Sequence, residues 1–148
     1  MDSNLVTESF GLTSYHEFYD FFLSENCWQA RLAQKLFEIS VDSPKICRSR
    51  CVAAVVKNRK IIAIGKNSLN STRLARRFKK NEDAVYEHAE ISAIKKGIRT
   101  GKHFDTIFVV RAIYRDGDWL TANAKPCPGC LGAIRHFNIR NVFYSMLT

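Results

Sequence analysis

Two short segments of the chain carry the residues that can do chemistry. The first is His88-x-Glu90, and the second is Cys127-x-x-Cys130 with Pro126 directly before it. An imidazole and two thiolates are ligands that zinc prefers, and three protein ligands leave a fourth position for water, as in catalytic zinc sites. A carboxylate two residues from a ligand can shuttle protons for that water. We therefore predict that His88, Cys127 and Cys130 bind Zn²⁺ and that Glu90 is catalytic.

Read together, the two segments give the pattern H-x-E…P-C-x-x-C of zinc-dependent nucleobase deaminases. On these residues the chain resembles the cytidine and deoxycytidylate deaminase superfamily. The resemblance implies a hydrolytic reaction in which Glu90 accepts a proton from water, donates one to the ring nitrogen and protonates the departing ammonia. It also implies that His88, Cys127 and Cys130 lie at the starts of two helices, where the helix dipole favours thiolates.

The histidine at position 88 resembles the deoxycytidylate, tRNA-adenosine, guanine and polynucleotide-cytosine branches of the superfamily. We predict conversion of cytosine to uracil in a nucleotide (dCMP-like) or a single-stranded nucleic acid. A tRNA-adenosine deaminase (A to I) is the nearest alternative, because that branch shares His-Ala-Glu and small residues such as Gly132 and Ala133 after the second cysteine. A non-catalytic nucleic-acid-binding zinc module is the alternative from another class.

The metal-binding segment itself has two other interpretations. A lone C-x-x-C is also typical of a thioredoxin-like redox pair. A structural zinc site would need a fourth ligand, for which the sequence offers Cys47, Cys51, His103 and His136. The His-x-Glu segment upstream favours the catalytic interpretation over both.

Four further residues are candidates for substrate binding. Asn67 matches an asparagine that binds the substrate sugar in several relatives, and Ala89 lies where the family backbone contacts the base. Tyr86 and Trp119 are aromatic side chains that can stack on a base. Each has a structural alternative, since an asparagine can also cap the following segment and an aromatic ring can also belong to the core.

The charge of the chain favours an anionic partner. The formal net charge is +9, and the segment from residue 66 to 81 holds six basic residues and no acidic one. Because guanidinium groups match phosphate oxygens, we predict phosphate binding in this segment, and a solvated loop is the alternative. The candidate phosphate-binding residues are Arg73, Arg76, Arg77, Lys79 and Lys80.

The predicted elements follow the order α-α-β-β-α-β-α-β. The strands are expected at 51–57, 60–65, 105–114 and 140–145, with turns at Asn58-Arg59 and Asp116-Gly117 and a short return through residues 119–120. Helices are expected at about 14–23, 26–42, 87–100 and 126–138. Right-handed crossovers put the last two helices on one face with their starts at the same sheet edge, so the two ligand turns can meet.

The predicted fold class is α/β. The resemblance implies a three-layer sandwich with a central mixed sheet of about four to five strands, which opens with a β-hairpin and carries helices on its faces. We predict an N-terminal arm and appended helix over 1–26, loose over 1–13, and a single deaminase-like catalytic domain over 27–148. The family's usual fifth strand is missing, which predicts an open sheet edge and favours a homo-oligomer.

The bulk composition predicts an ordinary globular protein. The chain has 148 residues, which fits one domain, and five cysteines, an odd number that argues against a disulfide framework. No apolar run approaches the length of a membrane span, and the first residues lack a basic segment followed by an apolar core. We therefore expect a cytoplasmic protein that does not associate with a membrane and that binds a nucleotide or a single-stranded nucleic acid.

Overall fold

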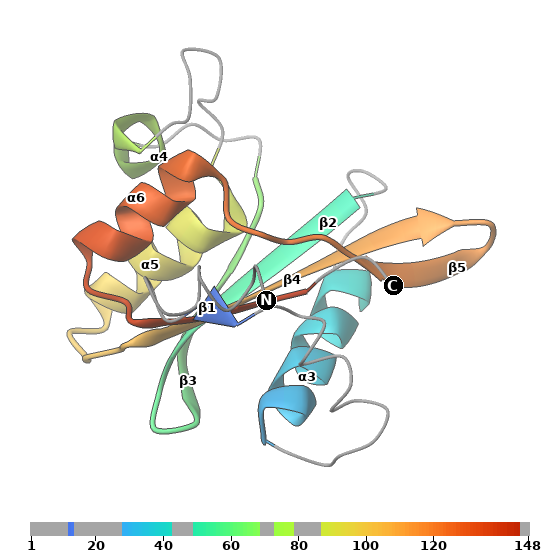
Figure 1. Cartoon of the computed structure of the whole chain (residues 1–148), viewed down its shortest axis with the longest axis horizontal. Coiled ribbons are helices and arrows are strands. Elements are labelled where there is room, and N and C mark those ends of the chain that lie inside the picture. Colours follow the sequence, from blue (N-terminus) through green and yellow to red (C-terminus); the bar gives the residue numbers. More distant parts are fainter. Residues whose placement is uncertain (1–11, 14–27, 43–48, 69–72, 79–86, 146–148) are drawn as a thin grey trace.

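A mixed β-sheet with helices on both faces organises the chain (Figure 1). The structure, a computed structural model, describes residues 12–13, 28–42, 49–68, 73–78 and 87–145. Its elements are β1 (Leu12–Thr13), α3 (Trp28–Asp42), β2 (Ser49–Lys57), β3 (Lys60–Lys66), α4 (Arg73–Arg77), α5 (Ala89–Arg99), β4 (Thr106–Arg115), β5 (Asp118–Ala122), α6 (Pro128–His136) and β6 (Asn141–Tyr144). The predicted α/β class and the predicted strands and helices within these ranges are confirmed.

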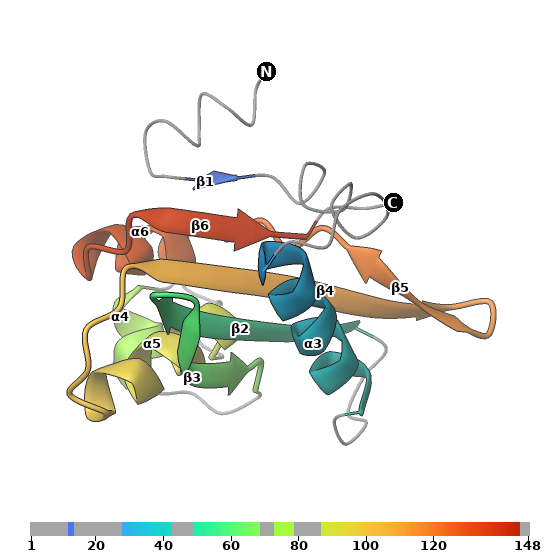
Figure 2. The same ribbon diagram turned by 90° about the horizontal axis from the view of Figure 1, so that it is seen from below.

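The strands lie in the order β1-β6-β4-β2-β3, with β5 also paired to β4 (Figure 2). Strand β4 pairs with β6 in parallel through Thr106–Val109 and with β5 in antiparallel fashion through Arg111–Arg115. Strands β5 and β6 therefore lie end to end along the same side of β4. The buried Ser145 closes this junction, because its hydroxyl accepts the Arg111 N–H at 3.0 Å and donates to the Ala122 carbonyl at 2.7 Å.

Both predicted hairpin turns form, and all of their central residues except Arg59 are types that favour left-handed backbone. Asn58 and Arg59 have φ angles of 51° and 66°, and Asp116 and Gly117 have φ angles of 52° and 87°. Two successive left-handed residues make a type I′ turn, whose twist matches that of the flanking strands. The two hairpins, β2–β3 and β4–β5, follow from this local chemistry.

Two apolar cores lie on opposite faces of the sheet. Helices α5 and α6 cover one face, where Ile94 and Ile134 pack with Val55, Ile107 and Val109. Helix α3 covers the other face. The predicted stripe of this helix packs on the sheet there, with Leu36 fully buried and its neighbours partly buried: Trp28, Leu32 and Ile39.

Helix α5 lies unusually close to strand β3, and Gly65 makes this approach possible. A Cβ atom at Gly65 would lie 2.2 Å from the Ala93 nitrogen and 2.6 Å from the Ala89 carbonyl oxygen. Contacts this short do not occur between real atoms, so the position requires glycine. Because Gly65 has no side chain, the first turns of α5 can pack directly against the backbone of β3.

The prediction for the N-terminus is wrong at two residues. The sequence predicts a loose arm over 1–13 and an open sheet edge beyond the last strand, but Leu12–Thr13 forms β1 in parallel with β6. Two residues are too few to show an alternating pattern, and their pairing satisfies backbone groups that the edge of β6 would otherwise leave to water. The helix predicted at 14–23 and the capping residue Asn26 lie outside the described residues.

None of the described helices combines the length and the apolar character that a membrane crossing requires.

Candidate metal centre and active site

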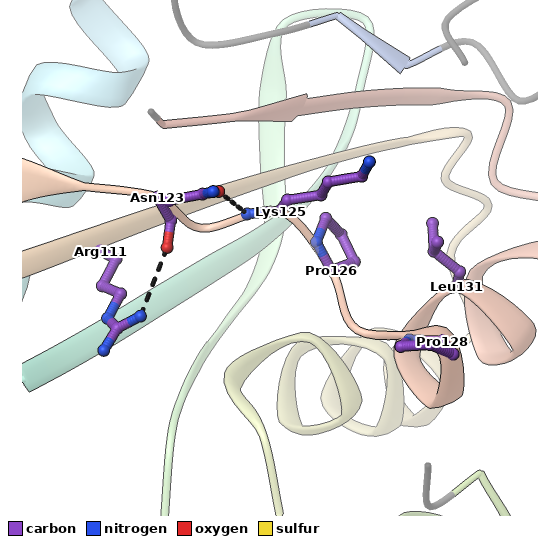
Figure 3. Close-up of a pocket in the computed structure, with 6 residues that line it drawn as sticks. All are labelled: Arg111, Asn123, Lys125, Pro126, Pro128 and Leu131. Atoms are coloured by element: carbon purple, nitrogen blue, oxygen red, sulfur yellow. Dashed lines mark hydrogen bonds between the residues drawn. The ribbon is translucent and has the colours of Figure 1, made fainter. Parts of the chain in front are cut away.

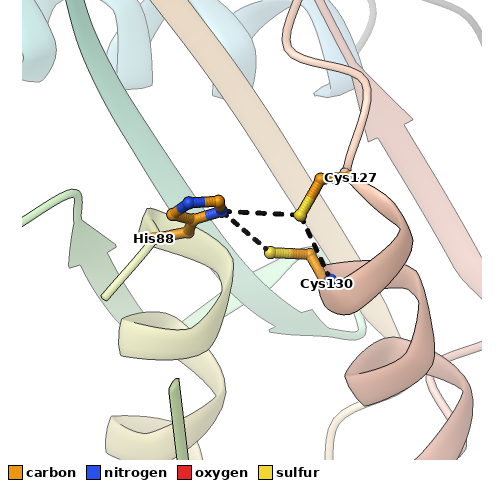
Figure 4. A group of neighbouring side chains, drawn as sticks. All are labelled: His88, Cys127 and Cys130. Atoms are coloured by element: carbon orange, nitrogen blue, oxygen red, sulfur yellow. Dashed lines mark hydrogen bonds between the residues drawn. The ribbon is translucent and has the colours of Figure 1, made fainter. Parts of the chain in front are cut away.

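Three predicted metal ligands converge in the structure (Figure 4). The Nδ1 atom of His88 lies 3.6 Å from the Sγ atom of Cys127 and 3.4 Å from the Sγ atom of Cys130. A tetrahedral zinc ion with ordinary bond lengths would hold a nitrogen and a sulfur ligand about 3.6 Å apart. The donor set and its spacing therefore fit Zn²⁺.

Helix starts position all three ligands. His88 is the N-cap residue of α5, with φ −76° and ψ 160°, and Cys127 is the N-cap residue of α6, with φ −69° and ψ 167°. Pro128 follows at the first position of α6, where a missing N–H costs little. The Cys130 N–H donates to Cys127 Sγ at 3.5 Å. The positive ends of both helix dipoles thus face the cluster and favour thiolate ligands.

Local hydrogen bonds make Cys127 acidic. The pKa of its thiol is lowered to about 3, first by the hydrogen bond from the Cys130 thiol, and further by His88 and by the Cys130 N–H. The pKa of Cys130 is raised, because its thiol donates that hydrogen bond and is buried. These contacts favour the thiolate form of Cys127, the protonation state that a metal ligand requires.

Glu90 lies in the first turn of α5 and is 5% exposed. Its pKa is raised, first by burial and also by the neighbouring Cys127, while a backbone hydrogen bond, His88 and a hydrogen bond with Cys130 act in the opposite direction. A carboxyl group whose pKa lies above its ordinary value is suited to carry a proton near neutral pH. The structure thus brings the predicted catalytic carboxylate to the predicted metal ligands.

Within the described residues, no fourth histidine, cysteine or acidic side chain joins the cluster. Cys51, His103 and His136 are described and lie outside it, whereas Cys47 lies outside the described residues. A three-ligand site is the arrangement that leaves a position for water. The described residues thus supply three ligands, and the imidazole beside the two thiols favours metal binding over a redox pair.

Asn67 lies directly after β3 and forms two hydrogen bonds with the neighbouring strand β2. Its N–H donates to the Cys51 carbonyl at 3.2 Å, and its Oδ1 accepts the Cys51 N–H at 3.0 Å. This contact fixes the orientation of the amide group, and within the described structure the Nδ2 group makes no hydrogen bond. Both interpretations of Asn67 remain compatible with this geometry, because the oxygen anchors a strand while the nitrogen can donate to a substrate.

The other substrate candidates lie in different surroundings. Ala89 is fully buried at the first position of α5, between the ligand and the carboxylate. Trp119 lies on the β4–β5 hairpin, where the Arg50 guanidinium is 4.4 Å from its ring centroid and Tyr114 packs edge-on at 5.4 Å. This environment favours packing over base stacking for Trp119. Tyr86 lies outside the described residues.

The basic segment contains a short helix, α4, that docks on α6. Phe78 packs against His136 and Phe137, with ring centroids 5.5 and 6.2 Å apart. The three arginines of α4 are exposed: Arg73, Arg76 and Arg77. Lys79 and Lys80 lie outside the described residues, and phosphate binding by the whole segment stays a prediction.

A pocket that the sequence did not predict lies beside the cysteine segment (Figure 3). Its volume is about 530 Å³, and its lining residues are Arg111, Asn123, Lys125, Pro126, Pro128 and Leu131. The two prolines flank the ligand Cys127. One available signal was that Asn123 and Lys125 stand directly before the P-C-x-x-C segment, whereas Arg111 stands in a mainly apolar strand.

A family model described as the cytidine and deoxycytidylate deaminase zinc-binding region matches residues 26–146. Two solved structures of dCMP deaminase from the cyanophage S-TIM5 are also similar to the chain. The apo form has 23% identity over 78% of this chain and 79% of that chain, with a TM-score of 0.46. The complex with dCMP and dUMP has 23% identity over 78% and 77%, with a TM-score of 0.47. Curated protein sequences give no match.

Proposed function

Because the chain belongs to the cytidine and deoxycytidylate deaminase family, we propose that it is a zinc-dependent hydrolase that converts cytosine to uracil in a nucleotide and releases ammonia. One observation carries this proposal: His88, Cys127 and Cys130 converge on one point, and the buried Glu90 lies beside them. Three soft ligands with an adjacent protonatable carboxyl group are the parts that hydrolytic deamination needs.

Each residue has a defined task in this reaction. His88, Cys127 and Cys130 would hold the ion, which when bound would activate a water molecule for attack on the ring carbon that bears the amino group. Glu90 takes the first proton of that water and delivers it to the neighbouring ring nitrogen. It then takes the second proton from the hydroxyl group newly added to the ring carbon and delivers it to the amino group, which leaves as ammonia while the carbonyl forms. The burial of Glu90 raises its pKa and so keeps it able to return the proton. In this proposal the Ala89 backbone contacts the base and the Asn67 amide group donates a hydrogen bond to the sugar.

The substrate assignment is supported by charge. A net charge of +9 favours a substrate that carries phosphate, and the exposed arginines of α4 supply part of that charge. A dCMP-like nucleotide and a single-stranded nucleic acid both meet this requirement, and a cytoplasmic location stays a prediction that accords with either substrate.

A substrate panel tests the proposal directly. Zinc-loaded protein is incubated with dCMP, deoxycytidine, a cytosine-containing single-stranded oligonucleotide and a tRNA anticodon stem-loop that contains adenosine. Ammonia release and base identity are measured, together with zinc content on the same sample. We expect about one zinc ion per chain and uracil formation. Formation of inosine would show that the substrate is adenosine and not cytosine. A zinc-containing protein that deaminates none of these compounds would favour the non-catalytic binding module.

Glu90→Gln separates catalysis from metal binding. The amide keeps the size of the side chain but cannot carry the proton, so we expect turnover to fall by about 10²- to 10⁴-fold while zinc content stays unchanged. Zinc is measured by atomic emission, and His88→Asn is the matched variant that should lose zinc as well as activity. Retained turnover in Glu90→Gln would remove this carboxylate from the mechanism.

A further inference from the structure

Ser145 is a fully buried serine in which every polar group makes a hydrogen bond. It directly follows β6, and its exposed fraction is 0%. Its hydroxyl accepts the Arg111 N–H at 3.0 Å and donates to the Ala122 carbonyl at 2.7 Å. Its backbone N–H donates to the Val109 carbonyl at 3.0 Å, and its own carbonyl accepts the Ala124 N–H at 2.8 Å. The residue thereby connects strand β4 both to the end of β5 and to the loop that follows β5.

The hydroxyl of Ser145 occupies a place that its backbone would otherwise fill. Strands β4 and β6 pair in parallel up to Val109 and Tyr144. In a continued parallel ladder, a residue bonds through its N–H and its carbonyl to the two residues that flank its neighbour on the next strand. The Ser145 carbonyl would therefore accept the Arg111 N–H. In this structure the Arg111 N–H donates to the Ser145 hydroxyl instead, while the Ser145 N–H keeps its bond to Val109.

This exchange leaves the Ser145 carbonyl available for the loop that bears a metal ligand. The carbonyl accepts the N–H of Ala124, which stands three residues before Cys127. Together with the bond from the hydroxyl to Ala122, it holds the chain on both sides of Asn123. A serine can do this because a hydroxyl both donates and accepts. With alanine at position 145, the carbonyl would be free to return to β4 and to release the loop.

The chain between this contact and the metal ligands is short and stiff. Ala124 and Pro126 are buried, and Pro128 begins α6. Two prolines on either side of Cys127 leave the backbone few conformations. A displacement of Ala124 is therefore transmitted to Cys127, whose Sγ atom lies 3.6 Å from the Nδ1 atom of His88.

We propose that Ser145 is a positioning residue for the metal centre: its hydroxyl takes the place of its carbonyl in the β4–β6 ladder, and the carbonyl fixes the loop that bears Cys127. The inference rests on the zinc-binding part of the proposed function and does not depend on which compound is deaminated. Contacts that orient metal ligands typically contribute 10- to 100-fold to metal affinity. Loss of the hydroxyl should therefore weaken metal binding although every ligand is still present.

Ser145→Ala tests this role against the matched control Ser40→Ala. Ser40 is also fully buried, and its hydroxyl donates to the Phe37 carbonyl at 2.7 Å within α3, on the opposite face of the sheet. In a chelator competition we expect Ser145→Ala to bind Zn²⁺ about ten-fold more weakly and Ser40→Ala to change the affinity by less than about two-fold. Thermal unfolding checks that both variants are folded at the temperature of the titration. The same zinc affinity in both folded variants would overturn the proposal.

Amide hydrogen exchange in the unaltered protein is a second measurement, which stays decisive if Ser145→Ala does not fold. Coupling between two sites is reciprocal, so zinc must protect the Ala124 N–H if its bond to Ser145 helps to place the ligand. We expect zinc loading to slow exchange at Ala124 by about ten-fold. The control amide is that of Arg140, which donates to the Asp105 carbonyl at 2.9 Å at the other end of β4. Equal slowing at both amides would mean that zinc stabilises the molecule as a whole, and the proposal would fail.

These measurements separate the inference from the deaminase function. Zinc binding that depends on Ser145, in a protein that deaminates no compound, would keep the inference and remove the proposed reaction. Deamination with the same zinc affinity in both alanine variants would keep the reaction and remove the inference. An unaltered protein that binds no zinc would overturn both.

Discussion

Glu87, the residue before the ligand His88, is only 5% exposed. Its carboxylate accepts two hydrogen bonds from Lys95 Nζ, at 2.8 and 3.1 Å, and its carbonyl accepts the Ser68 N–H at 2.9 Å. These contacts tie the turn that bears His88 to the middle of α5 and to the turn after β3. Glu87 therefore holds the turn that bears His88 in place, and it is not itself one of the three clustered ligands.

Lys95→Met should weaken this support. The variant leaves a buried carboxylate without its cation, so we expect the free energy of unfolding to fall by roughly 2–3 kcal/mol. Because the supporting contacts of a metal ligand typically contribute 10- to 100-fold to affinity, we also expect zinc to bind about ten-fold more weakly in a chelator competition. Lys96→Met, at the exposed neighbouring position, is the control. Equal zinc affinities in the two variants would show that the Glu87–Lys95 pair serves stability alone.

The residue scale also shows what a sequence can reveal. His88, Glu90, Cys127 and Cys130 could be found because their types and spacing spell out a chemical requirement. The pocket beside Cys127 could not be found, because its lining residue Arg111 stands in an apolar strand and becomes informative only once the register places it opposite Cys51. The contact of Trp119 could not be found either, since nothing local shows that the Arg50 guanidinium lies over its ring.

At the scale of elements, the contact between β3 and α5 decides where the metal ligand lies. Gly65→Ala would place a methyl group against the α5 backbone, and neither partner can move without shifting its whole element. We expect a loss of about 1–3 kcal/mol in the free energy of unfolding together with weaker zinc binding, measured by urea denaturation and chelator competition.

Gly132→Ala is the matched control for this variant. Gly132 lies within α6, and a Cβ atom there would lie 3.7 Å from the Phe78 side chain, an ordinary van der Waals distance. Alanine is a better helix former than glycine by up to about 1 kcal/mol, so the control should be as stable as the unaltered protein or more stable. Unchanged zinc affinity in Gly65→Ala would mean that the first turn of α5 adapts independently of β3.

A second contact between elements makes stability depend on pH. The Asp105 carboxylate accepts from Lys57 Nζ at 2.9 Å and from the Thr106 hydroxyl at 2.9 Å, where β4 begins beside β2. The hydrogen bond from Lys57 is the main reason that the pKa of Asp105 is lowered. A lowered pKa means that the contact stabilises the fold above the unfolded value of about 4 and stops doing so as the pH falls through the folded value.

Asp105→Asn should therefore cost stability at pH 7 and progressively less below about pH 4. Urea denaturation from pH 3 to pH 7 measures the difference between the two proteins. Asp118→Asn, at an exposed position on β5, controls for the loss of one negative charge. A difference that does not change with pH would mean that the charge of Asp105 does not cause it. No difference at any pH would leave only the backbone carbonyl of Asp105, which accepts hydrogen bonds from Arg140 and Asn141 in both proteins.

The elements were predictable where local chemistry decides them. The hairpin turns carry Asn58, Asp116 and Gly117, which tolerate left-handed backbone, and Gly101, with φ 71°, ends α5 as its position suggests. Strand β1 was not predictable, because Leu12–Thr13 has strand geometry only through its pairing with β6. The boundaries of β2 and β4 differ by one or two residues from those expected, since neighbouring strands and not sequence patterns set where a ladder stops.

At the scale of the whole molecule, the positive charge gives a test of polymer binding. If the α4 arginines bind the backbone of a single strand, Arg73→Gln combined with Arg76→Gln should reduce the dependence of oligonucleotide affinity on salt. The slope of log K against log salt should fall by about 0.7 for each lost phosphate contact. Fluorescence anisotropy across a salt series measures the slope, with Arg99→Gln combined with Lys102→Gln as the charge-matched control. Equal slopes in both double variants would assign the effect to net charge.

The homo-oligomer stays a prediction, but the open edge of β6 on which it rested is paired with β1. The edge of β6 that was expected to be open carries the two-residue strand β1, so the outer strands among the described elements are β1, β3 and β5. Light scattering on the purified chain measures the oligomeric state. Asn67 and the start of α5 both lie beside the end of β3, so the proposed function requires that an assembly through β3 leave this end of the strand uncovered.

The long strand β4 separates two parts of the molecule with different tolerance to change. Its first half supports the helices that hold the metal ligands, and its second half continues into a hairpin that projects away from α5 and α6 (Figures 1 and 2). The exposed turn at Asp116-Gly117 therefore offers a site for inserting a peptide tag or a fluorescent label. Such a fusion would report on the protein without reaching the chemistry that β4 supports at its other end.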